Sequence, residues 1–215
     1  MIGKSHNKAA ERPTLIRLLQ LCSILNGQLL AWREKLEKQG HSQLYWMIPS
    51  VADSPADDPV LGRVFPLAFQ FPSLRIAQLL LLYWSMLILL YRTIQDIGKR
   101  LKETGGTESQ GIFRLQDTDR SEVCSDDSFP SNDLIALLAN NISQSLEHCY
   151  RATNGTRGPQ ITIFPVWVAK SFYESQSNRG RELAWCSELG DTTAPDSRFD
   201  LYVMKLKRGW LSGGS

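Results

Sequence analysis

The chain has 215 residues, of which 42% are hydrophobic and 21% are charged, and its 24 basic and 22 acidic side chains leave a formal charge of +2. This length suits one helical domain of ordinary size or two very small ones. The composition excludes wholesale disorder, a collagen-like chain and a small disulfide scaffold, and the balanced charge does not indicate a dedicated nucleic-acid binder.

An amphipathic pattern opens the first half of the chain. Pro13 suits the first position of a helix, and apolar residues then recur three and four positions apart until Gly40. The pattern therefore predicts a helix that begins at about residue 13, preceded by a disordered N-terminus over residues 1–12. The apolar positions are Leu15, Leu18, Leu19, Cys22, Leu25, Leu29, Trp32 and Leu36.

Residues 48–72 connect this helix to the next apolar stretch. They hold five prolines, which preclude a continuous helix. Near the end of the connection, Phe65, Leu67, Phe69 and Phe71 alternate with other residues. We therefore expect this part of the connection to pack on the core.

Pro72 and Ser73 start a second long helix that is apolar nearly all round. The 16 residues from Ile76 to Tyr91 carry no charge. At about 1.5 Å per residue they span roughly 24 Å, which is less than the roughly 30 Å of a hydrocarbon core. We therefore expect a central core helix covered on every side, and a single membrane span at about 73–94 is the alternative.

The segment 104–130 differs from its neighbours. It is rich in Gly, Ser and Thr, its six acidic residues outnumber two basic ones, and it lacks apolar periodicity. This composition predicts a flexible acidic linker.

The helical period returns at Ser131. It predicts one helix from there to about Ala152, a second that opens at Pro165, and a shorter one from Arg181 to Leu189. The stretch from Asn154 to Pro159, between the first two of these helices, is predicted to be a turn.

These elements together predict an all-α fold without a sheet, an irregular multi-helix bundle around a buried central hydrophobic helix. The helices over residues 13–190 are expected to form one domain, with the flexible insertion at 104–130. Residues 191–215 are expected to form a C-terminal tail.

His148 and Cys149 are the most suggestive pair for nucleophilic or metal chemistry. Neighbouring helical residues point about 100° apart, so the two side chains do not readily share one ligand position. Cys149 lies on the apolar stripe of its helix, which indicates a packed thiol with a boundary imidazole beside it.

Arg181, Glu182 and Trp185 form a second cluster. A catalytic Glu182 would need a partner acid, a metal or a nucleophile, and the sequence supplies none that can be placed beside it. We expect Arg181 and Glu182 to brace neighbouring helices while Trp185 fills the core.

The remaining candidates favour structural interpretations as well. Asp53, Asp57 and Asp58 suggest cation binding, but their spacing is not that of an EF-hand loop, and a solvated acidic turn is expected. Neither the Gly105-Gly106 pair nor the Gly155…Gly158 pair has the context of a phosphate loop. The sequence predicts no catalytic, cofactor-binding or metal-binding residue, and a protein that is not an enzyme.

Short phrases in a fixed order give the sequence its family resemblance. They are Leu29-Leu-Ala-Trp32, Phe69-Gln-Phe-Pro72, Ala77-Gln-Leu-Leu-Leu-Leu-Tyr-Trp84, Ala139-Asn-Asn-Ile-Ser-Gln-Ser145, Cys149-Tyr150, and Arg181-Glu182 before Trp185. In this order the chain resembles, over about residues 14–190, the C-terminal regulatory region of fungal zinc-cluster transcription factors. That resemblance implies a nuclear protein that regulates transcription through protein partners or a small effector, with a homodimer among the partners.

The DNA-binding head of that family has no counterpart in this chain. The head needs six cysteines at short spacings to hold two zinc ions, whereas Cys22, Cys124, Cys149 and Cys186 lie far apart. Such widely spaced cysteines indicate reduced structural thiols of an intracellular protein. We therefore expect no sequence-specific DNA binding by this chain alone, and a membrane association is not expected.

The cysteine spacing generates a direct prediction about metal content. Because no short Cys or His spacing can close a tetrahedral site, the purified protein should contain no stoichiometric zinc. Elemental analysis of the protein purified without chelators measures this. One or two zinc ions per chain would contradict the prediction.

Overall fold

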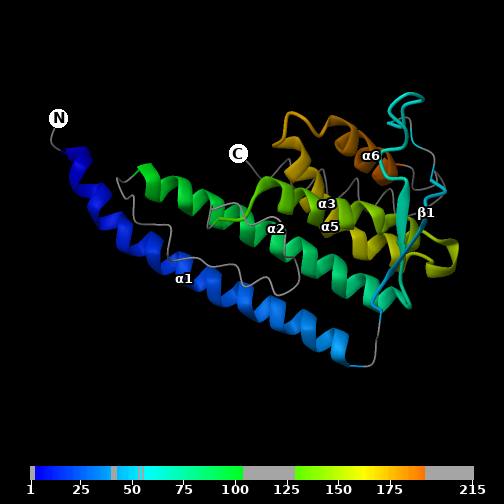
Figure 1. Cartoon of the computed structure of the whole chain (residues 1–215), viewed down its shortest axis with the longest axis horizontal. Coiled ribbons are helices and arrows are strands. Elements are labelled where there is room, and N and C mark those ends of the chain that lie inside the picture. The colour runs from blue at the N-terminus through cyan, green and yellow to red at the C-terminus, as the bar shows by residue number, and fades with distance from the viewer. Residues whose placement is uncertain (1–2, 40–42, 53, 55, 104–128, 192–215) are drawn as a thin grey trace. The chain divides into compact units, whose positions relative to one another are not determined.

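The computed structural model of the chain describes residues 3–39, 43–52, 54, 56–103 and 129–191 (Figure 1). They fold into two compact units. Unit 1 contains residues 1–44 and 82–139, and unit 2 contains residues 45–81 and 140–215. The boundaries between the units fall inside α2 (Leu74–Glu103) and inside α3 (Asn132–Gln144).

The first helix, α1, is longer than its sequence pattern predicts. It spans Gly3–Lys38 with Pro13 inside it, so the disordered N-terminus expected over residues 1–12 is wrong for residues 3–12. A proline removes one intrahelical hydrogen bond, but the residues before it include Ala9, Ala10 and Glu11, which favour a helix. The helix therefore continues through the proline.

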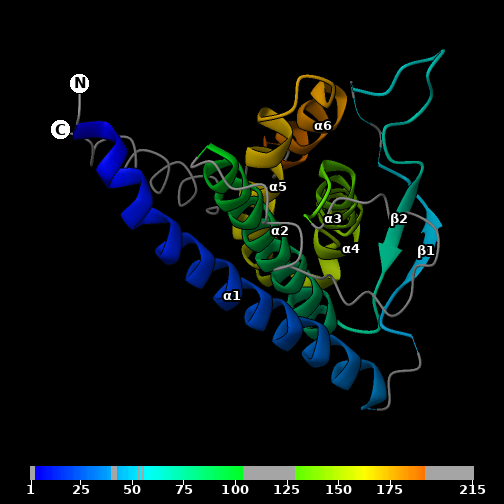
Figure 2. The ribbon, with the colours of Figure 1, turned by 60° about the vertical axis from the view of Figure 1, so that its left-hand side comes forward.

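In unit 1, α1 lies antiparallel beside the C-terminal part of α2 (Figures 1 and 2). The Trp32 and Tyr83 rings are 5.7 Å apart at one end of this pair. At the other end, the Arg100 guanidinium lies 3.9 Å from the Glu11 carboxylate. The buried side of α1 also carries Asn26, whose side-chain oxygen has no hydrogen-bond partner among the described residues.

The central helix α2 is mostly covered, as its composition predicts. Leu80, Leu81 and Ile88 have no exposed surface, whereas Leu82 and Met86 leave a narrow apolar stripe about 40% exposed. The Ser73 hydroxyl accepts a hydrogen bond from the Ile76 amide at 3.3 Å and caps the start of the helix. The expected start at Pro72 and Ser73 is therefore confirmed.

Unit 2 contains a small antiparallel sheet, so the expectation of no sheet is wrong. Strand β1 (Trp46–Pro49) pairs with β2 (Leu67–Gln70), with Trp46 opposite Gln70 and Pro49 opposite Leu67. The aromatic alternation before α2 belongs to β2 and its flanks, where Phe69 is buried. The expectation that this stretch packs on the core is confirmed.

The second half of the chain is broken at other points than the sequence pattern predicts. One helix was expected from Ser131 to Ala152, but α3 ends at Gln144 and a one-turn helix, α4 (Leu146–Cys149), follows it. The break is at Ser145, whose hydroxyl donates to the Asn141 carbonyl at 2.7 Å while its amide bonds three residues back to Ile142. A serine that competes for backbone groups in this way interrupts a helix.

The next two helices are α5 (Arg157–Glu174) and α6 (Gly180–Asp191), preceded by a 3₁₀ turn, η2 (Ala152–Asn154). Helix α5 begins eight residues before Pro165, so the expected start at Pro165 is wrong. The expected short helix over residues 181–189 is confirmed within α6.

The fold class predicted from the sequence is confirmed, because the described residues are mostly helical. Of the acidic linker expected over residues 104–130, residues 104–128 lie outside the described residues, as do residues 192–215 of the C-terminal tail expected over 191–215. The structure divides the chain into two compact units, and the single domain expected over residues 13–190 stays a prediction.

Two helices are long and apolar enough to cross a membrane by length and composition alone. They are α2 and the Glu11–Lys38 part of α1. In α2, 61% of the most apolar stretch is buried, as in the core helix of a soluble protein, whereas in α1 only 17% is buried. Length and composition are weak evidence by themselves, because core helices satisfy the same criteria.

The different exposure of two neighbouring α2 residues allows a matched test of the core. Ile88→Asp should lower the free energy of unfolding by at least about 4 kcal/mol, because it buries an unpaired carboxyl group. Met86→Asp, at a position 42% exposed, should lower it by about 1 kcal/mol or less. Urea unfolding followed by circular dichroism measures both, and equal effects would show that α2 is not a core helix.

Candidate functional site

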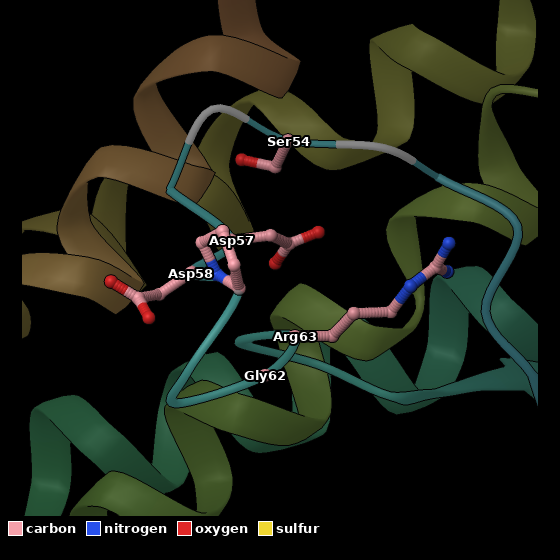
Figure 3. Close-up of a pocket in the computed structure, with 6 residues that line it drawn as sticks. Ser54, Asp57, Asp58, Gly62 and Arg63 are labelled. Carbon is pink, nitrogen blue, oxygen red and sulfur yellow. The ribbon is translucent and has the colours of Figure 1, made fainter.

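The loop that connects β1 to β2 in unit 2 holds three aspartates, of which the structure describes Asp57 and Asp58 (Figure 3). The Asp57 carboxylate accepts a hydrogen bond from the Val64 amide at 2.8 Å. The Asp58 carboxylate accepts two, from the amides of Val60 at 2.7 Å and Leu61 at 2.8 Å. These amides lower the pKa of Asp58 below its usual value.

Helix α6 fastens this loop. The Arg181 guanidinium donates to the carbonyls of Ala56 at 3.3 Å and Gly62 at 2.5 Å. Next to it, Phe65 meets Trp185 edge to face with the ring centroids 4.9 Å apart, and both side chains are buried. The expected bracing role of Arg181 and the core role of Trp185 are thus visible, although Arg181 braces a loop and not a second helix.

Glu182 has its own ion pair in the structure. Its carboxylate lies 2.8 Å from the Arg179 guanidinium, one turn before it on the chain. This contact engages the carboxylate at the start of α6, and Glu182 also adds to the burial that raises the pKa of the Cys186 thiol. The described contacts of Glu182 thus fit the structural role expected from the sequence.

The aspartate loop surrounds an open hollow of about 320 Å³. In Figure 3, the side chains of Asp57 and Asp58 point in different directions, and Arg63 extends away from Asp58 to donate to the Ser50 carbonyl at 2.5 Å. The carboxylates do not converge on one point, and both already accept backbone hydrogen bonds. The hollow therefore does not assemble a cation site from these two residues, and Asp53 lies outside the described residues.

His148 and Cys149 are both buried in α4, so the imidazole expected at the boundary belongs to the interior. Burial raises the pKa of the Cys149 thiol to about 12. A thiol with so high a pKa is almost wholly protonated near neutral pH and is a poor nucleophile. The packed role predicted for Cys149 fits this environment.

A second buried thiol belongs to a polar network between α3, α5 and α6. The Ser143 hydroxyl lies 3.1 Å from the Cys186 sulfur and 3.2 Å from the Tyr173 hydroxyl. The Tyr173 hydroxyl in turn donates to the Asn140 side chain at 2.9 Å. Burial raises the pKa of Cys186 to about 11, so this network joins helices and offers no reactive thiolate.

Gly158 has a packing role that its sequence context did not reveal. A Cβ atom at this position would lie 1.9 Å from the Cys149 carbonyl oxygen. The glycine therefore lets the first turn of α5 approach the end of α4 closely. The turn expected from Asn154 to Pro159 is therefore wrong from Arg157 onward, where α5 begins.

The surface of α1 carries a feature that the sequence analysis missed. Four large apolar side chains remain 41–59% exposed, although two of them, Leu18 and Leu25, belong to the pattern that predicts the helix. We call them the α1 row: Leu18, Leu21, Ile24 and Leu25. The signal was present as a stretch of 15 uncharged residues from Leu18 to Trp32, which is too apolar for a helix with one buried side.

No group of three or more metal-ligating side chains occurs in the part of the chain that the structure describes. Comparison with known proteins adds no assignment, because no family model, curated protein or solved structure matches the chain.

The close approach at Gly158 can be tested by one methyl group. Gly158→Ala should lower the free energy of unfolding by about 1–3 kcal/mol, because the methyl group would overlap the Cys149 carbonyl. The matched control is Gly27→Ala in α1, where nothing lies within 4 Å of the added atom. That change should raise stability by about 0.5–1 kcal/mol. Thermal unfolding of the two variants decides, and an unchanged Gly158→Ala protein would contradict the packing described.

Proposed function

We propose that this chain is a non-catalytic, helical regulatory domain that acts in transcription by binding a protein partner through the α1 row. The proposal takes its biological setting, the nucleus, from the resemblance to the regulatory region of fungal zinc-cluster transcription factors. Its single supporting observation is the exposed α1 row, because clustered exposed apolar side chains mark interaction surfaces.

The spacing of the α1 row suits recognition by another helix. Leu18, Leu21 and Leu25 are three and four residues apart, so they follow one side of α1, and Ile24 lies beside them. This is the spacing by which apolar side chains anchor a helix in a partner's groove or receive a partner helix.

The charges of α1 indicate the chemistry of the partner. All three acidic side chains of its Glu11–Lys38 part are in ion pairs: Glu11 with Arg100, Glu34 with Lys38, and Glu37 with Arg33. Arg17 and Lys35 are exposed and have no ion pair within the described ranges. They lie on the same side as Ile24, seven residues before it and eleven after it, and about 27 Å apart along the helix. A partner whose surface carries apolar side chains between acidic ones would complement this arrangement of the α1 row and its two cations.

A reporter assay tests the proposal. The chain is fused to an unrelated DNA-binding domain in yeast, and transcription from the matching reporter is measured. The fusion should change reporter output at least severalfold, and Leu21→Asp with Ile24→Asp should abolish most of that change, since carboxylates in the row oppose both apolar contact and acidic partners. Val60→Asp is the control, because Val60 is an equally apolar side chain 91% exposed in the loop of unit 2.

The outcomes separate the parts of the proposal. A fusion that leaves the reporter unchanged would contradict a role in transcription. Reporter output that survives the double substitution would contradict the α1 row as the binding surface. Light scattering of the purified protein tests whether the α1 row binds a second copy of the chain. A dimer that the double substitution dissociates would show that a second copy, and not an acidic partner, covers the α1 row.

The alternative function is that of a small membrane protein anchored at about residues 73–94. The uncharged stretch of α2 favours it, and the 61% burial of the most apolar part of that helix opposes it. Cell fractionation distinguishes the two functions. Recovery of the protein only in detergent extracts of membranes would support the anchor and reject the regulatory domain.

A further inference from the structure

Two consecutive side chains of α4 hold the ends of both strands in unit 2. The Glu147 carboxylate accepts hydrogen bonds from the Ser50 hydroxyl and from the Val51 amide at 3.1 Å, directly after β1. The His148 imidazole lies beside Phe71, directly after β2. The pair of strands is therefore attached to α4 at two neighbouring points.

The contacts of His148 define its protonation state. Its Nδ1 accepts a long hydrogen bond, 3.5 Å, from the Phe71 amide, so the ring is neutral with its hydrogen on Nε2. The Nε2 atom is buried and has no hydrogen-bond partner among the described residues. The ring meets Phe71 edge to face at 5.2 Å, and the side chain of Asn154 holds the His148 carbonyl at 2.7 Å.

We propose that His148 is a proton-sensitive clasp, and that protonation of its imidazole releases the β1–β2 strands from α4. Protonation would place a hydrogen on Nδ1 opposite the Phe71 N–H, so that two donors face each other. It would also create a cation in a buried site, where burial penalises charge.

The charged groups on the elements that surround His148 are few. Glu147, its neighbour on α4, keeps its charge and accepts hydrogen bonds from Ser50 and Val51 after β1. Arg151 follows the helix and repels a positive charge on the ring. Strand β2 has no titratable side chain, and the charged residues of α5, which also packs on α4, are Arg157, Lys170 and Glu174.

The release has a defined direction with pH. Burial, and secondarily Arg151, lower the pKa of His148 below its usual value of 6.5. Since the attached form binds the proton more weakly than the released form, the clasp is at full strength above pH 6.5 and weakens as the pH falls below it. The equilibrium for release then rises by up to about tenfold per pH unit, until the pKa of the attached form is reached.

Amide hydrogen exchange of the full chain, corrected for the intrinsic pH dependence of exchange, tests the clasp. Protection of the amides in residues 46–50 and 67–71 should fall up to about tenfold between pH 7.5 and 5.5. In His148→Gln, which keeps a hydrogen-bonding side chain but does not titrate, the protection should be the same at both values. His41→Gln is the control for the histidines elsewhere in the chain and should behave like the unmodified protein.

A second variant covers the case in which His148→Gln fails to fold. Arg151→Gln changes an exposed side chain and removes the repulsion, which raises the pKa of His148 in the attached form, so the loss of protection on acidification should be smaller and should level off at a higher pH than in the unmodified protein. Protection that is unchanged from pH 7.5 to 5.5 in the unmodified protein would overturn the proposal. A loss that persists in folded His148→Gln, or a loss that is as large and levels off at the same pH in Arg151→Gln as in the unmodified protein, would overturn it as well.

Discussion

A long uncharged stretch of helix in water must be covered, and this requirement of α2 governs much of the organisation of the chain. From Ile76 to Tyr91 no charged side chain marks a solvent side, so only a narrow stripe at Leu82 and Met86 stays exposed. In unit 1 the cover includes α1, which meets α2 through Trp32 and Tyr83. In unit 2, the aromatic side chains that flank β2 contact Trp185 of α6 and His148 of α4. Most of the apolar stretch of α2, which by composition alone could cross a membrane, is thus buried within the protein.

The sequence predicts best where one pattern runs without interruption. The start of α2 was predictable because Ser73 caps a long apolar run, and α6 was predictable because a polar stretch precedes it. The predicted helix starts at Pro13 and Pro165 are wrong, because each proline lies inside a helix that tolerates the loss of one hydrogen bond. Strand β1 has only four residues and no alternation of burial, so it depends on its pairing with β2 and not on its own sequence.

The candidate sites show the same division between local and long-range information. The packed state of Cys149 was predictable from its place on an apolar stripe. The contacts of Asp57 and Asp58 with loop amides, and of Arg181 with loop carbonyls, were not, because they depend on the path of the backbone. In each case a polar side chain that suggests a catalytic or metal site in the sequence forms hydrogen bonds that hold a loop or the end of a strand. This use of the polar groups is consistent with the interaction role proposed for the chain.

The buried amide of Asn26 has a consequence for α1. Its side-chain oxygen is shielded from water without a hydrogen-bond partner in the described structure, which costs about 1–3 kcal/mol relative to a satisfied group. That penalty falls on the packed state of α1 and disappears when the helix separates from its neighbours. Local stability varies across a protein, and a buried group without a partner lowers it where that group lies. The helix that displays the α1 row thus carries a local penalty that separation from its neighbours would relieve.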